Sequence, residues 1–214
     1  KGGFMRKWMG LLLGLMLVVS VAPVYGEGEI FVTAVNKIAS TKKGVPNTYR
    51  VILNDSIEVK DIVMEKSDGK TVIKYPVYTS ARGKVYPQFE VLSEQAAAEI
   101  EKSVKTGKPS ATVAKSMTFK ISKFSKLKRP STLKAFASVD FNNAVRVECK
   151  IMGGKKGPWV SWPAVKDETT GKYNKQVSVV NKNVKKVVEN SLLKRYAAAD
   201  VETETDDMEV QEEE

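Results

Sequence analysis

The most informative segment of the chain begins Gly157-Pro158-Trp159-Val160-Ser161-Trp162-Pro163. A polar loop follows over residues 166–172, then a strand-like run over residues 173–180 and a basic helical segment over residues 182–196. Apolar residues recur three and four positions apart in the last segment, which predicts one buried helix face. We expect that face to contain Val184, Val187, Val188, Ser191 and Leu192.

The same order of features occurs twice along the chain. A predicted hairpin turn at Asn54-Asp55 corresponds to Asn142-Asn143, 88 residues later. Tyr75-Pro76 corresponds in the same way to Trp162-Pro163, 87 residues later. A helix follows each aromatic-proline pair, and the first of these helices is predicted over residues 94–104. Two copies in one chain indicate a duplicated domain.

The apolar pattern predicts an α+β fold in which each copy is a small, mainly antiparallel β-sheet closed by a C-terminal helix. In the second copy, one strand places alternate residues on a single face: Leu133, Ala135, Ala137, Val139 and Phe141. The returning strand does the same with Val145, Val147, Cys149 and Ile151. Arg146 and Lys150 then fall on the opposite face of that strand.

Four segments are expected from these patterns. Residues 1–26 have basic residues, a short apolar run and a small-residue cleavage site, so they resemble a signal peptide. This predicts export to the periplasm or cell surface, with an uncleaved anchor or a cytoplasmic location as alternatives. Residues 27–108 form the first repeat and residues 109–199 the second. Residues 200–214 hold nine acidic residues and no basic one, which predicts a disordered tail.

Composition narrows the chemistry. The chain has no histidine, which excludes histidine-based acid–base catalysis and histidine metal ligands. Its single cysteine, Cys149, excludes an intrachain disulfide and a multi-cysteine zinc site. No paired-carboxylate, phosphate-loop or nucleophile arrangement is present. We therefore expect a protein that is not an enzyme and that holds no metal or cofactor.

Short motifs in the second repeat occur in a defined order. They are Ala137-Ser138-Val139-Asp140-Phe141-Asn142-Asn143, the segment 157–163, Gly171-Lys172-Tyr173 and Val179-Val180-Asn181, followed by Val188, Leu192 and Tyr196. In this order they resemble the SpoVG family of small bacterial proteins named for sporulation and septation. The first repeat keeps the layout but is more diverged.

The resemblance implies a non-enzymatic regulatory protein that binds nucleic acid and is linked to septation or sporulation. It implicates basic residues after the family's proline, which here are reduced to Lys166, and Trp162 stands where the family has methionine. A typical member is a cytoplasmic homodimer with one repeat per chain. The two repeats of this chain are therefore expected to form an intrachain pseudo-dimer.

Charge is concentrated in the second repeat. Residues 27–108 hold 13 basic and 11 acidic residues, whereas residues 109–199 hold 19 basic and 5 acidic residues, a net charge of +14. A surface of this kind attracts nucleic acid or another polyanion, although lysine-rich surfaces that bind nothing specific are also common. The predicted polyanion-binding residues are Arg146, Lys150, Lys155, Lys156, Trp162, Lys166, Lys172, Lys182, Lys185 and Lys186.

The two tryptophans of the key segment are three residues apart, so in a strand they point to opposite faces. We expect Trp159 to pack in the core and Trp162 to be exposed, where it would stack on a base or a partner's side chain. Cys149 is expected to be a buried apolar residue.

The sequence is consistent with two functions of different classes. The first is a nucleic-acid-binding regulator of septation or sporulation that acts through the basic second repeat. The alternative is an exported cell-envelope module that uses the same fold to bind a protein partner or an anionic polymer. The predicted signal segment favours the second function, and the family resemblance favours the first.

Overall fold

A computed structural model describes the chain except residues 1–28, 41–42, 68, 111–115, 168–169 and 210–214, and the side chains from residue 200 onward. The expected signal segment, residues 1–26, lies outside the described residues. Within the described part of the chain, no helix is both long enough and apolar enough to cross a membrane.

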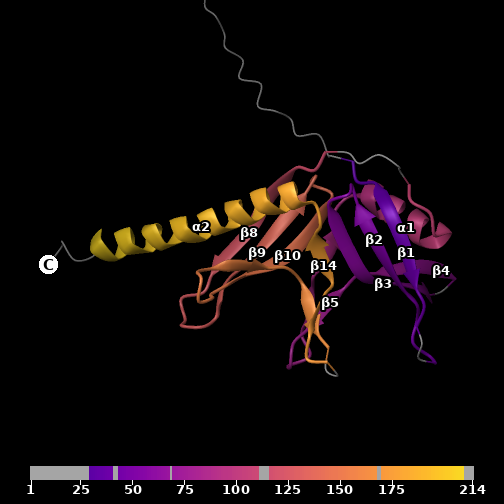
Figure 1. Ribbon diagram of the computed structural model, residues 1–214, viewed down its shortest axis with the longest axis horizontal. Coiled ribbons are helices and arrows are strands. Elements are labelled where there is room, and N and C mark those ends of the chain that lie inside the picture. The colour runs from indigo at the N-terminus through magenta and orange to yellow at the C-terminus, as the bar shows by residue number, and fades with distance from the viewer. Residues whose placement is uncertain (1–28, 41–42, 68, 111–115, 168–169, 210–214) are drawn as a thin grey trace, which may run out of the picture.

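The architecture is α+β, with two five-stranded antiparallel sheets and two long helices (Figure 1). The first sheet has the order β1-β2-β3-β14, with β4 also paired to β3. Its strands from the first repeat are β1 (Val32–Ile38), β2 (Thr48–Leu53), β3 (Ile57–Ser67) and β4 (Lys70–Lys74). The second sheet has the order β11-β10-β9-β8, with β7 also paired to β10. Its strands from the second repeat are β8 (Phe119–Lys126), β9 (Leu133–Phe141), β10 (Val145–Met152) and β11 (Trp159–Ser161).

Each repeat donates one strand to the sheet of the other. Strand β7 (Phe89–Val91) leaves the first repeat and pairs with β10, while β14 (Val177–Val179) leaves the second repeat and pairs with β3. The registers are equivalent, because Val91 lies opposite Val145 and Val179 lies opposite Ile57, with 88 residues between corresponding members. The two repeats are therefore joined by a reciprocal exchange of equivalent strands in equivalent registers.

A single inserted residue explains why the repeat spacing changes from 88 to 87. On β3, Val59 and Ile62 are three residues apart. Their partners on β2, Val51 and Tyr49, are only two residues apart. The extra residue is Asp61, whose backbone is left-handed with φ 56°. A β-bulge of this kind accommodates one additional residue in one strand of an antiparallel pair.

The helices close the sheets on one face each. Helix α1 (Glu94–Thr106) packs on β1 and β7, and α2 (Lys182–Glu209) packs on β8, β11 and β14. Equivalent residues cap them, since the Ser93 hydroxyl accepts from the Ala96 amide and the Asn181 side chain accepts from the Val184 amide.

Two expectations for α2 need correction. The helix continues to Glu209, so residues 200–209 are helical where disorder was expected, and residues 210–214 lie outside the described residues. The buried stripe consists of Val188 and Leu192, with Val184 and Tyr196 partly buried beside them. Residues spaced four apart, such as Val188 and Leu192, lie on the same side of an α-helix. Val187 does not fit this spacing, so it points away from the sheet and is exposed.

A β-hairpin extends from each repeat. The first arm joins β5 (Val77–Thr79) to β6 (Val85–Pro87), and the second arm joins β12 (Ala164–Lys166) to β13 (Tyr173–Lys175). Strands β13 and β14 are separate, which divides the single run expected over residues 173–180 at Gln176. In Figure 1 the region of β5 and the arms lies on the side of the molecule away from α2.

Apolar side chains between each sheet and its helix form the core. In the second repeat the predicted alternation is confirmed for Ala135, Ala137, Val139 and Phe141 of β9 and for Val145, Val147, Cys149 and Ile151 of β10, which are all buried. Leu133 is only half-buried, because the pairing of β9 with β10 shifts register before it. Burying these aliphatic side chains removes apolar surface from water, which is the main favourable contribution to folding. The opposite face of the second sheet, which α2 leaves uncovered, carries polar and aromatic residues and is called the outer face below.

Candidate nucleic-acid interface

The outer face of the second sheet can be followed row by row from the strand registers. Arg146 of β10 lies between Asp140 of β9 and Glu90 of β7. Two positions along, Glu148 lies opposite Ser138, and after two more Lys150 lies between Phe136 of β9 and Ser161 of β11. The last row pairs Met152 with Trp159. Successive residues on one face are spaced by about 6.6 Å, so these rows form a continuous surface.

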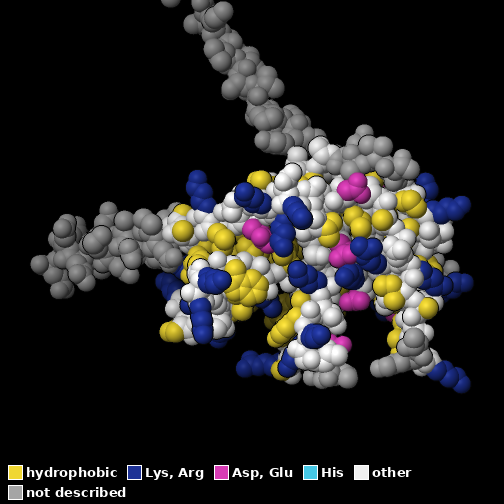
Figure 2. Space-filling model, in the orientation of Figure 1, with side chains coloured by type: hydrophobic (Ala, Val, Ile, Leu, Met, Phe, Trp, Pro, Cys, Tyr) yellow, Lys and Arg dark blue, Asp and Glu magenta, His cyan; other side chains and the backbone are white. Residues whose placement is uncertain are grey.

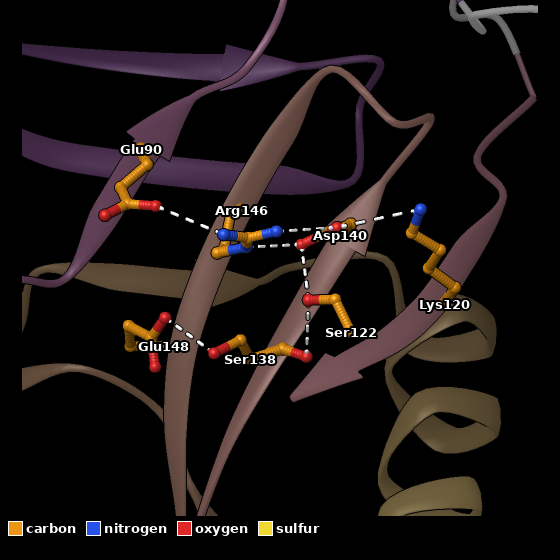
Figure 3. A network of polar contacts seen from close by, with 7 residues as sticks. All are labelled: Glu90, Lys120, Ser122, Ser138, Asp140, Arg146 and Glu148. Carbon is orange, nitrogen blue, oxygen red and sulfur yellow. Dashed lines mark hydrogen bonds and ion pairs between the residues drawn. The ribbon is translucent and has the colours of Figure 1, made fainter. Parts of the chain in front are cut away.

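An ion-pair network occupies the end of the outer face at the strand exchange (Figure 3). Arg146 donates two hydrogen bonds to Asp140, at 2.6 and 3.0 Å, and its Nη1 lies 3.6 Å from the Glu90 carboxylate. Burial alone would raise the pKa of Asp140, but the Arg146 and Ser122 hydrogen bonds and the charge of Lys120 hold that pKa below its ordinary value. The hydrogen bond to Asp140 likewise raises the pKa of Arg146. The charge of Arg146 is thus paired with two carboxylates of the protein, whereas a polyanion contact at Arg146 stays a prediction.

A second carboxylate on this face is held differently. Ser138 donates a 2.7 Å hydrogen bond to Glu148, as Figure 3 shows. Burial is the largest influence on Glu148 and raises its pKa, and the nearby Glu90 charge adds to this, against the opposing effect of Ser138, Lys123 and Arg146. Negative charge is therefore disfavoured at Glu148.

Beyond this network the outer face has no acidic residue at the positions paired above, and two large rings are exposed there. Phe136 is 42% exposed and Trp159 is 50% exposed. Lys150 lies beside Phe136 in the register, between the two rings. The indole of Trp159 packs beside Gly154, where an added Cβ would lie 3.3 Å from the ring. The β10–β11 loop therefore supports one side of the ring and leaves the other available.

The first arm brings two more rings to this surface from the other repeat. The Lys150 ammonium lies 5.1 Å from the centre of the Tyr78 ring, and Tyr78 lies 6.2 Å from Tyr86. The Lys84 ammonium lies 5.1 Å from the Tyr86 ring. Each of these two tyrosine rings thus has a lysine ammonium at a distance typical of cation–π contacts. Figure 2 shows hydrophobic side chains gathered below α2, with Lys and Arg side chains at their border.

The structure places the predicted lysines in three separate regions. Lys155 and Lys156 are exposed on the β10–β11 loop and, with Lys150, border the outer face. Lys166 and Lys172 are exposed on the second arm. Lys182, Lys185 and Lys186 lie in the first turns of α2, on the other side of the sheet, where Lys185 pairs with Glu189 at 3.9 Å. The predicted set is therefore not one contiguous site.

The assignments of the two tryptophans are reversed. Trp162 is only 6% exposed, and its indole N–H donates a 2.8 Å hydrogen bond to Glu189 of α2. The opposite-face reasoning holds, but β11 pairs at the sheet edge with Val160 directed inward, so Trp159 falls on the outer face. Trp162 follows the strand end and packs under the helix. It is a core residue, so the expected exposure of Trp162 is wrong.

The sequence patterns did not identify three of these candidate residues: Phe136, Tyr78 and Tyr86. A signal for Phe136 was present, since it is the one large apolar residue on the outward-facing positions of its strand, between Ala135 and Ala137. No comparable signal existed for Tyr78, because its contact with Lys150 depends on the strand exchange between repeats.

Cys149 is buried, as predicted, and burial raises the pKa of its thiol to about 12, with smaller contributions from the Glu148 and Glu189 charges. A thiol that remains protonated in this way is unreactive. Cys149 therefore belongs to the core and not to the surface site.

The first repeat provides an internal comparison for the outer face. The strand registers identify the equivalent positions of the two repeats. Phe136 corresponds to Thr48, and Lys150 to Val63. Met152 corresponds to Glu65, and Trp159 to Val72. Lys74 pairs with Glu65 at 2.6 Å. The equivalent surface thus lacks both aromatic rings and has an acidic residue, so the aromatic and basic face is specific to the second repeat.

Comparison with known protein families gives a match that lies within the second repeat. Residues 117–198 match the model of the family described as SpoVG. No curated protein matches the chain. The family match runs from just before β8 into α2, and it confirms the resemblance inferred from the motifs of the second repeat.

Proposed function

We propose that the protein is a non-enzymatic regulator that binds nucleic acid through its second repeat, in which residues 117–198 match the model of the family described as SpoVG. We further propose a link to septation or sporulation, which rests on the family alone. A family describes the fold more reliably than the function, so the site must carry the binding proposal.

The observation that carries the proposal is that the acidic side chains and the lysines occupy different parts of the outer face. Asp140 is neutralised by Arg146, and Glu148 has a raised pKa. Lys150, Lys155 and Lys156 lie beyond this network, and the last two are exposed on their loop. Lysines on such a surface attract the phosphates of a nucleic acid. Binding releases the counterions condensed on those phosphates, which makes the affinity strongly dependent on salt.

Charge reversal on the β10–β11 loop tests this proposal. The full chain is titrated against a fluorescently labelled oligonucleotide by anisotropy, over a series of salt concentrations. The double variant K155E/K156E is expected to weaken binding at low salt and to reduce the slope of log K against log salt by about 1 to 2, since each phosphate contact contributes about 0.7 to 0.9.

The first repeat offers a matched control. Lys66 and Lys70 flank the equivalent β3–β4 turn and are both exposed, so K66E/K70E makes the same change in net charge on the other repeat. If both variants weaken binding equally, the effect is due to net charge and the proposed face is wrong. If the chain binds an anionic wall polymer and no nucleic acid, the cell-envelope function replaces this one.

A further inference from the structure

We propose that the outer face of the second sheet binds single-stranded nucleic acid, with bases stacked on Phe136 and Trp159. This inference rests on the proposed function and narrows its ligand. It also gives the first repeat a part in binding, because Tyr78 and Tyr86 of the first arm extend the surface.

The positions of the two rings are set by the sheet. Phe136 is on β9 and Trp159 is on β11, with β10 between them, and Trp159 is one row further along the strands. Two strand spacings of about 4.8 Å and one row of about 6.6 Å separate their backbones. The rings therefore lie too far apart to stack on each other and are placed to receive separate bases.

Exposed apolar residues are common on protein surfaces, so exposure alone does not indicate a binding site. The arrangement here is more specific because lysines lie next to the exposed rings. Lys150 lies between Phe136 and Tyr78, and Lys84 lies over Tyr86. Proteins recognise single-stranded nucleic acid with two components: basic residues that follow its sugar-phosphate backbone, and aromatic rings on which its bases stack.

The same geometry disfavours a duplex. In a double helix each base is stacked on its neighbours, so its face is not available to a protein ring. Flat rings standing on a sheet contact bases only when these are unstacked. The lysines around the rings would attract either form, whereas Phe136 and Trp159 distinguish between them.

The test uses the full chain and one DNA sequence in two forms, single-stranded and annealed to its complement. The wild-type chain is expected to bind the single strand more tightly. W159A and F136A are each expected to weaken single-strand binding by about 5- to 150-fold, the range for loss of one stacked base. The salt slope should be unchanged in W159A, because stacking releases no counterions, whereas K155E/K156E should reduce it.

V72A is the matched control, since Val72 occupies the position of Trp159 in the first repeat and is also exposed. It should leave both affinities unchanged. Trp159 is exposed and Trp162 is buried against α2. Quenching of tryptophan fluorescence by the single strand should therefore be reduced in W159A, with any remaining quenching due to Trp8.

Two results would overturn the inference, and they differ in what they mean for the proposed function. If the wild-type chain binds both DNA forms equally and W159A binds as tightly as wild type, nucleic-acid binding stands and the stacking surface is wrong. If the wild-type chain binds neither form, both proposals fail.

Discussion

Asn54 and Asn142 donate hydrogen bonds to the same carbonyl oxygen, that of Glu29, at 3.0 and 3.2 Å. Each closes the hairpin of its own repeat in a left-handed conformation, with φ 45° and 51°. Each side-chain oxygen also accepts from an equivalent backbone amide, that of Phe31 or Thr118. The two turns therefore meet beside the junction of the repeats, and both side chains are buried.

Replacing Asn142 with alanine should lower the free energy of unfolding by about 3 kcal/mol. The loss combines an unpaired Thr118 amide, about 1 to 3 kcal/mol, with a left-handed backbone that costs alanine about 1 to 2 kcal/mol. N142G loses the same hydrogen bonds but adopts the backbone freely, so it should be less destabilised. Urea denaturation measures both. Equal losses in N142A and N142G would show that backbone conformation is not part of the effect.

The strand exchange leads to a prediction about oligomeric state. Strands β7 and β14 already fill the positions that a second chain would occupy on β10 and β3. The facing residues fit this pairing: Glu58 accepts from Ser178, and Arg146 lies beside Glu90. In a self-paired first repeat, Glu58 would instead face Glu90, and like charges directly opposite are destabilising. We expect sedimentation analysis to give a monomer at all concentrations, and an obligate dimer would contradict the pseudo-dimer proposal.

Stability should fall in acid because of two buried carboxylates. Burial opposes the charges of Glu58 and Asp140, but hydrogen bonds from Arg50 and Ser178, and from Arg146 and Ser122, hold both pKa values below their ordinary range. A lowered folded-state pKa contributes stability above the unfolded-state pKa, and this is lost as the pH falls through the folded-state value. D140N should therefore be less stable than wild type at neutral pH, and the difference should shrink in acid. A difference that does not depend on pH would contradict this origin.

Glu148 should show the opposite dependence. Its raised pKa means that the folded state favours the protonated form, so the charged form reduces stability at neutral pH. E148Q is neutral and still accepts the Ser138 hydrogen bond. Its melting temperature should exceed that of wild type at neutral pH, and the gain should disappear below the pKa of an ordinary glutamate. A variant less stable than wild type at pH 7 would show that the Glu148 charge is favourable.

The Asn turns and the alternation on β9 and β10 could be predicted because they depend on local spacing. The strand exchange could not, since each three-residue strand β7 and β14 is consistent with either sheet until the pairing is known. The reversal of Trp159 and Trp162 has the same kind of cause. Their spacing requires opposite faces, but only the packing of α2 decides which face is covered.

The candidate surface was predicted in part. Charge counting identified the second repeat, but it could not separate Arg146, which is neutralised by Asp140, from Lys155, which is exposed. Helix lysines such as Lys186 were grouped with the sheet because sequence alone does not show that α2 and the outer face lie on opposite sides.

The most direct test of the account is a map of the backbone amides that respond to nucleic acid. The isotope-labelled full chain is titrated with a single-stranded oligonucleotide, and amide chemical shifts are followed by NMR. We predict changes on β9, β10, β11 and residues 153–158, together with the first arm, and none on the equivalent strands β2, β3 and β4. Changes confined to α2 or to the first sheet would contradict binding at the outer face of the second repeat.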